Sequence, residues 1–162
     1  MTYIFIGIYI AAMVTANLLV WWLGPWFSPF NSFLLIGMDL TMRDLLHERV
    51  TRLQMCAVIL VGGLITYLAN PAAVNIAIAS ATAFTASSFV DWLVYEKLKN
   101  KAWLVRSNGS NAAGAVVDSF IFPTLAFGAF MPHIVALQIA AKIGGGFVWS
   151  WLLRKHIVKV TP

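Results

Sequence analysis

Ionisable side chains lie inside otherwise apolar stretches of this 162-residue chain. Asp39 and Arg43 are four residues apart, which puts both on one face of a helix, so we expect them to neutralise each other. Asp118 and Lys142 lie in two further apolar stretches, with Gln138 one helical turn before the lysine. We expect Asp118 and Lys142 to meet across helices.

Two amides, Asn17 and Asn111, add neutral donors and acceptors to this set. The apolar stretches are expected to span a membrane, as argued below. A charged side chain at mid-membrane costs about 2.5–3.5 kcal/mol on insertion scales, so each one needs a counter-charge or a function. Asp91 is an exception, because its stretch is about to end at Lys97 and water should be near. The polar residues either form ion pairs that fix helix register or line a cavity for a small polar solute, and we favour the cavity. The candidate substrate-binding residues are Asn17, Asp39, Arg43, Asn111, Asp118, Gln138 and Lys142.

Catalytic and metal-binding patterns do not emerge from the sequence. Cys56 is the one cysteine, and the three histidines, His47, His133 and His156, fall in different segments without ligand spacing. Residues 144–146 are three glycines, but they lack the Lys-Ser/Thr of a phosphate-binding loop. An intramembrane hydrolase would also need a nucleophile with its base. We therefore expect no enzyme, no cofactor and no metal.

The composition places the chain in a membrane. Hydrophobic residues make up 60% and charged residues 10%, against about 45–50% and about 25% in soluble domains. A bilayer core needs about 20 mainly apolar residues per helix. An all-α bundle of six transmembrane helices in a single domain, residues 1–162, is predicted, with spans at about 3–23, 31–47, 53–69, 72–95, 112–131 and 134–153.

Basic residues predict the orientation of these spans. They cluster after the second, fourth and sixth spans, whereas the connections at 24–30, 70–71 and 132–133 contain no lysine or arginine. The positive-inside rule then puts both termini in the cytoplasm and the protein in the cytoplasmic (inner) membrane. This distribution also explains the net charge of +5 without nucleic acid as a partner, because each cluster is short and follows a span.

Aromatic and small residues suggest how the bundle is anchored and packed. Tryptophans gather near both expected membrane faces, as in the aromatic belts of membrane proteins. Small residues recur at four-residue spacing, for example at Ala12 and Ala16 and along residues 140–145, which favours close helix packing. We attribute these faces to packing within one chain, and a homo-oligomer stays open.

Several of these polar residues also carry a family likeness. Residues 38–44 (MDLTMRD), 91–99 (DWLVYEKLK) and 110–119, together with Phe122 and Lys142, resemble the vitamin uptake transporter family. Its members are mostly regarded as queuosine precursor transporters. The resemblance implies import of 7-cyano-7-deazaguanine or 7-aminomethyl-7-deazaguanine, and a fold similar to the substrate-binding components of energy-coupling-factor transporters. It places functional residues at Asn17, Asp39, Arg43, Asp91, Asn111, Asp118 and Lys142.

The chemistry of such a purine-like ligand agrees with these side chains. A carboxylate such as Asp118 can accept from the ring N–H and exocyclic amine, and Lys142 can donate to the carbonyl or pair with Asp118. An aromatic slot, or one lined by the glycines at 144–146, would suit a planar ring. Two alternatives stay open: a vitamin-binding subunit that needs a separate energising module, which could grip the face of Ala12 and Ala16, and a structural or pore-forming membrane protein.

Overall fold

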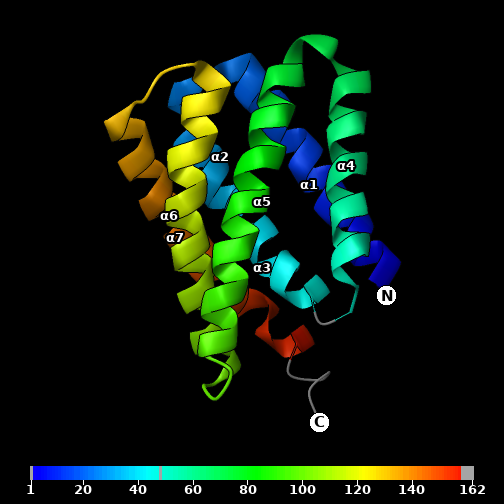
Figure 1. Ribbon diagram of the computed structural model, residues 1–162, viewed down its shortest axis with the longest axis vertical. Helices are drawn as coiled ribbons and strands as arrows, with labels where there is room; N and C mark the ends of the chain where they lie inside the picture. The colour runs from blue at the N-terminus through cyan, green and yellow to red at the C-terminus, as the bar shows by residue number, and fades with distance from the viewer. Residues whose placement is uncertain (1, 48, 158–162) are drawn as a thin grey trace.

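A computed structural model describes residues 2–47 and 49–157, and these residues form helices and connections without a strand. Six helical rods run between two ends of the molecule (Figure 1). The helices are α1 (Thr2–Leu23), α2 (Ser28–Asn31), α3 (Gly37–His47), α4 (Arg52–Ala69), α5 (Val74–Lys97), α6 (Trp103–Phe127) and α7 (Pro132–Ile157). Short turns precede or join them: η1 (Pro25–Phe27), the π-helical η2 (Ser32–Ile36) and η3 (Pro71–Ala73).

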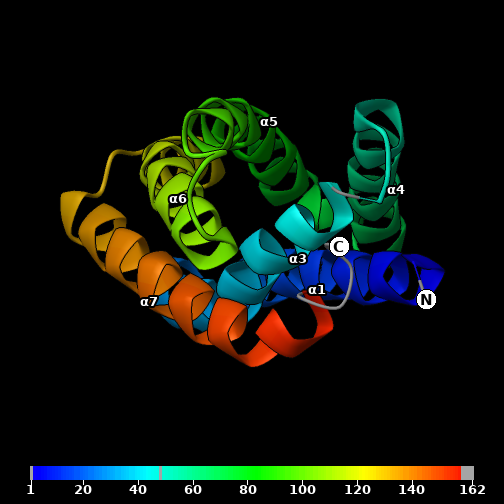
Figure 2. The ribbon, with the colours of Figure 1, turned by 90° about the horizontal axis from the view of Figure 1, so that it is seen from below.

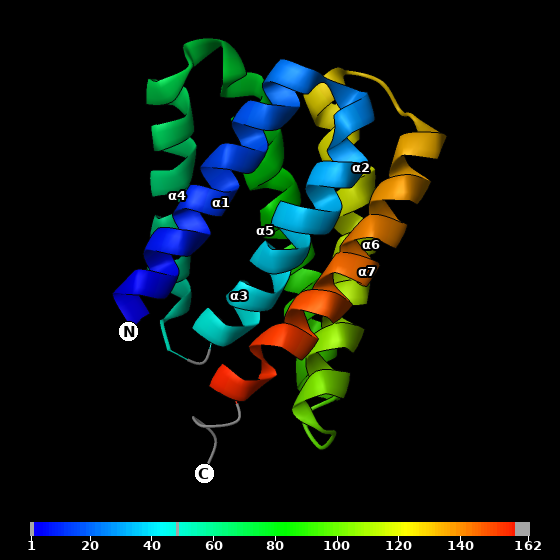
Figure 3. The same cartoon turned by 180° about the vertical axis from the view of Figure 1, so that it is seen from behind.

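The second rod is composite, because α2, η2 and α3 follow one another without a break. Seen from behind, it lies between α1 and α7 (Figure 3). Seen from below, α3 lies near the centre of the bundle, with α5 on one side and α1 and α7 on the other (Figure 2). The most charged of the predicted spans therefore has the most central position.

Three helices are long and apolar enough to cross a membrane by length and composition: Thr2–Leu23, Pro71–Lys97 and Pro132–Leu153. Leu53–Ala69 is a shorter apolar helix. The composite rod and α6 carry too many polar groups to qualify by composition alone, so the six-span membrane arrangement remains a prediction. The predicted helical segments themselves are confirmed within a few residues, with one exception.

The exception is α6, which begins at Trp103 rather than at residue 112 and ends at Phe127 rather than at residue 131. The early start includes polar residues that the prediction assigned to a connection. Two of them, Ser107 and Asn111, contact Asp44 of α3, so their polarity serves a buried interior. The helix ends because Gly128 has a φ of 69°, a left-handed conformation that glycine adopts readily.

The surface and the interior have the reverse of the usual polarity. Trp22 and Trp26 are each 74% exposed, and large apolar side chains are exposed along every rod. Buried positions include Arg43, Asp91 and Lys142. An apolar exterior around charged residues is the arrangement expected where lipid replaces water. The chain is therefore a membrane protein.

The two ends of the bundle differ in charge as predicted. The start of α1, the connection between α3 and α4 and the connection between α5 and α6 lie at one end, and η1 and η3 lie at the other (Figure 1). Both connections at the first end are flanked by basic residues. Arg154 and Lys155 also fall at the end of α7, whereas Lys159 lies outside the described residues.

Glycines bring α7 against the composite rod. A Cβ added to Gly145 would lie 2.1 Å from the carbonyl oxygen of Phe33, and one added to Gly37 would lie 2.7 Å from the carbonyl carbon of Gly145. The predicted use of residues 144–146 as a ligand slot is therefore wrong, because η2 backbone fills the space at Gly145 and none of the three glycines lines a cavity described below. The face of Ala12 and Ala16 does pack within one chain, as predicted, since both residues are buried, whereas Ala140 is exposed.

Candidate functional site

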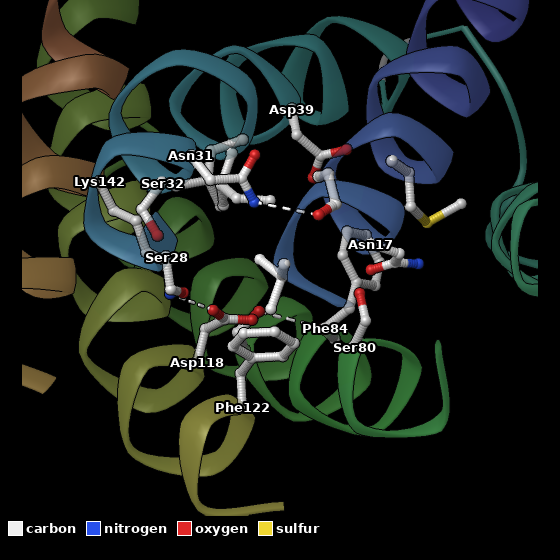
Figure 4. Close-up of a pocket in the computed structure, with 16 residues that line it drawn as sticks. Asn17, Ser28, Asn31, Ser32, Asp39, Ser80, Phe84, Asp118, Phe122 and Lys142 are labelled. Carbon is white, nitrogen blue, oxygen red and sulfur yellow. Dashed lines mark hydrogen bonds and ion pairs between the residues drawn. The ribbon is translucent and has the colours of Figure 1, made fainter. Parts of the chain in front are cut away.

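A cavity lies between the composite rod and the helices α1, α5, α6 and α7 (Figure 4). Its volume is about 40 Å³, well below the range of about 300–1,000 Å³ typical of ligand sites, so a ring-sized solute enters only if lining side chains move. Four of the seven predicted site residues line it: Asn17, Asp39, Asp118 and Lys142. Other polar lining residues are Ser28, Asn31, Ser32, Ser80 and Ser87, and two aromatic rings, Phe84 and Phe122, also face the cavity.

Lys142 and Asp118 form an ion pair between α7 and α6, which confirms the predicted meeting across helices. The lysine Nζ also donates to Ser119 Oγ at 3.0 Å and to Gln138 Oε1 at 2.9 Å. An ammonium has three hydrogens, so these three partners use all of them. In this arrangement Lys142 positions Asp118 and has no hydrogen left for a ligand carbonyl.

The Asp118 carboxylate contacts Lys142 and is also partly exposed to the cavity. Lys142 contacts Oδ2, and the side chain of Asp118 retains 16% exposure where that of Lys142 retains 1%. Gln138 does not line the cavity, but its Nε2 donates to Ser28 Oγ at 2.6 Å. The predicted residue Gln138 therefore ties Lys142 to a cavity-lining serine.

Asp39 enters the same cavity from the opposite side. Figure 4 shows Asp39 and Asn17 across the cavity from Lys142 and Asp118. Asp39 is buried and its Oδ1 accepts no hydrogen bond within the described part of the chain. The expected ion pair with Arg43 is wrong, although the two side chains interact electrostatically at longer range. A carboxylate without a close cation thus faces the cavity.

Amide groups supply donors near this carboxylate. Asn17 Nδ2 donates to Thr66 Oγ1 at 3.4 Å, and Asn31 Nδ2 donates to the carbonyl oxygen of Ala16 at 3.3 Å. Each amide nitrogen carries a second hydrogen, so both side chains can also donate to a bound solute. The cavity therefore combines acceptors on two sides with amide donors and two phenyl rings.

Arg43 and Asn111 do not reach the cavity and belong to a second polar cluster. Arg43 Nη2 lies 3.2 Å from Asp91 Oδ1, and both side chains are 0% exposed. Asn111 Nδ2 donates to Asp44 Oδ2 at 3.0 Å. The expectation that Asp91 lies near water is therefore wrong, because α3 and α6 cover it and Arg43 supplies its counter-charge.

Sequence reasoning missed one face of α5. Ser80, Phe84 and Ser87 line the cavity, and Asp91 continues the same face into the second cluster. These residues are spaced four, three and four apart, which is the periodicity of one helical face. This spacing is visible in the sequence, but a search for buried charged residues passes over serine and phenylalanine.

The described residues contain no group of three His, Cys, Asp or Glu side chains placed to hold a metal ion. The cavity can recognise a solute through two carboxylates, one engaged ammonium, amides and aromatic rings. Such a set can orient a small polar ring by hydrogen bonds and stacking.

Comparison with known protein families identifies the family of this chain. The sequence matches the family described as "Putative vitamin uptake transporter" over residues 1–154. A search of curated proteins and a search of solved structures each found no match, so the similarity to energy-coupling-factor components stays a prediction. The family match covers every helix that lines the cavity, up to residue 154. The chain belongs to the vitamin uptake transporter family.

Proposed function

We propose that the protein imports a queuosine precursor, 7-cyano-7-deazaguanine or 7-aminomethyl-7-deazaguanine, through the cavity between α1, α3, α5, α6 and α7. The observation that carries this proposal is the pairing of two cavity-facing carboxylates, Asp39 and Asp118, with two phenyl rings. A deazaguanine presents adjacent N–H donors on a flat aromatic ring. Carboxylates accept such donors in pairs, and phenyl rings stack on such faces.

The geometry of the cavity supports particular contacts within this proposal. Asp118 is held by Lys142 and accepts from the amine edge of the ring, while Asn17 and Asn31 donate to the ring carbonyl. Asp39 lacks a close cation, so the cavity has one more negative than positive group. This excess favours the aminomethyl form, whose ammonium can pair with Asp39, over the neutral cyano form.

Binding can be tested on the detergent-purified chain with both deazaguanines and a panel of heteroaromatic vitamins. A ligand that binds the folded state raises its stability by about 2.7 kcal/mol at a hundredfold excess over the Kd. We expect thermal stabilisation by the deazaguanines, and its loss in Asp118→Asn, because the new amide presents a donor to the ligand's donors. Glu96→Gln, which changes an exposed carboxylate in the same way, is the matched control.

Stabilisation by a vitamin but by neither deazaguanine would refute the substrate assignment. Unchanged binding in a well-folded Asp118→Asn variant would refute the site. Uptake of labelled precursor by cells that lack their own synthesis, and by liposomes containing the purified chain alone, then tests import. Uptake that requires an added ATPase complex would favour the alternative of a vitamin-binding subunit. The face of Ala12 and Ala16 no longer supports that alternative, since it is buried within the bundle.

The proposed orientation has both termini in the cytoplasm. Single cysteines at Trp26 and at Lys99, introduced after Cys56→Ser, report on opposite ends of the bundle. We expect an impermeant thiol reagent to label Trp26→Cys in intact cells and Lys99→Cys only after the membrane is opened. Labelling of both variants from outside would show that the orientation is wrong.

A further inference from the structure

A second buried cluster of charges lies between α3, α5 and α6, outside the cavity. Arg43 and Asp44 come from α3, Asp91 from α5, and Ser107 and Asn111 from α6. Arg43 and Asp91 are 0% exposed and Asp44 is 1% exposed. The cluster thus contains two carboxylates and one guanidinium in a place that water does not reach.

Several acceptors of this cluster are buried without a donor. Asp44 Oδ2 accepts from Ser107 Oγ at 2.6 Å and from Asn111 Nδ2 at 3.0 Å, whereas Asp44 Oδ1 has no hydrogen-bond partner in the part of the chain described. Asp91 Oδ2 and the amide oxygen of Asn111 are also buried without a donor. A buried acceptor without a donor is costly, and a buried charge without a counter-charge is more so. Arg43 Nε and Nη2 also have no hydrogen-bond partner in the described residues, but with two carboxylates and one guanidinium the cluster still lacks one positive charge.

A proton fits this deficit better than a metal cation does. The groups that face Asp44 are Arg43 on its own helix, Asp91 on α5, and the uncharged Ser107 and Asn111 on α6. The Arg43 guanidinium contacts Asp91 and interacts electrostatically with Asp44, Tyr9 and Asp39, so the cluster already contains a cation. A metal ion would sit against this positive charge, whereas a proton neutralises one carboxylate and adds a donor.

We propose that Asp44 is a proton-binding site, with the nearby charge of Asp91 favouring its protonation and Asn111 as its amide partner. When Asp44 is protonated, its hydroxyl becomes a donor, and a half-turn of the Asn111 amide presents the unpaired oxygen to it. When the proton leaves, the amide returns its nitrogen to the carboxylate, as the structure shows. The proton is taken up and released as such, so no other reactant is needed.

This site is linked to the cavity by two shared residues. Arg43 Nη1 lies 3.5 Å from Ser87 Oγ, and the Arg43 guanidinium carbon lies 5.3 Å from the centre of the Phe84 ring. Ser87 and Phe84 both line the cavity. A solute that displaces either side chain therefore changes the surroundings of Arg43. This change alters the free energy needed to ionise Asp44 beside Asp91. Use of the proton to drive import is the one part that rests on the proposed function.

Infrared spectroscopy tests the proton site without any substrate. The C=O stretch of a protonated carboxyl group is recorded for the reconstituted full chain between about pH 5 and about pH 9, a range in which an ordinary exposed carboxyl is already ionised. We expect a protonated carboxyl that titrates within this range and is lost in Asp44→Asn or Asp91→Asn. Glu96→Gln should leave it unchanged. A signal that neither Asp44→Asn nor Asp91→Asn alters would overturn the proposal.

Ser107→Ala is a milder variant in case the carboxylate variants do not fold. It removes a hydrogen bond that stabilises the charged form of Asp44 more than the neutral form, so the midpoint of the titration should move to higher pH by about one unit. An unmoved midpoint would show that the titrating group is not Asp44.

Proton movement in liposomes then tests the link to the cavity. Neutral 7-cyano-7-deazaguanine is added outside vesicles that contain the purified chain and a trapped pH dye. We expect acidification of the lumen with the wild type, and exchange of labelled for unlabelled probe without acidification in Asp44→Asn. Accumulation driven by a sodium gradient at constant pH would contradict the link. Absence of any probe uptake would refute the cyano form as cargo, while the infrared result still decides the proton site.

Discussion

Removing the ammonium of Lys142 should destabilise the bundle through the partner that it leaves behind. Lys142→Met keeps an unbranched side chain of similar length but deletes three hydrogen bonds, to Asp118, Ser119 and Gln138. Asp118 would then keep a negative charge beside the cavity with no cation in contact. Gln138 would retain one strong contact, to Ser28.

The size of the effect follows from the burial of the pair. Breaking a buried ion pair by removing one partner costs about 3–5 kcal/mol. Asp118 retains 16% exposure to the cavity, so we expect the lower end, about 3 kcal/mol. For a chain of this length, each kcal/mol lowers Tm by about 2–4 °C, which gives a fall of about 6–12 °C. Asp118→Asn in the same chain should restore part of this loss, because the stranded charge is gone.

The assay is thermal unfolding of the four proteins of this double-mutant cycle in one detergent. Lys99→Met, which removes an exposed lysine, is the control and should leave Tm unchanged. We expect a coupling energy of about 0.5–3 kcal/mol between positions 118 and 142. A Tm for Lys142→Met within about 2 °C of the wild type, or strictly additive losses, would refute the reasoning.

Two further predictions concern the packing of the interior. Arg43→Gln should couple to Asp91→Asn by about 0.5–3 kcal/mol and more weakly to Asp39→Asn, because the guanidinium contacts Asp91 and does not contact Asp39. Stronger coupling to Asp39 in a thermal double-mutant cycle would contradict the structure. Gly145→Ala should destabilise the protein by about 1–3 kcal/mol, because its Cβ would meet the Phe33 carbonyl oxygen, whereas Gly146→Ala, whose Cβ meets nothing within 4 Å, should be neutral or stabilising in the same melts.

The sequence by itself determined the helical segments and the polarity of the interior. Apolar stretches of sufficient length have few alternatives to a helix in lipid, where backbone groups must bond within their own segment. The meeting of Asp118 and Lys142 was predictable for a related reason, because a charge in each of two apolar helices needs a partner. The basic connections at one end followed from the order of the spans.

Only the tertiary structure decided which polar groups share a site. Arg43 has Asp39 one turn away on its own helix, yet its guanidinium pairs with Asp91 of α5 and leaves Asp39 to the cavity. The polar start of α6 reads as a connection until Asp44 of α3 is placed beside it. Helical periodicity determines which side chains share a face of a helix, but it does not determine which other helix that face contacts. Long side chains such as arginine then reach their partners across the interface between the two helices.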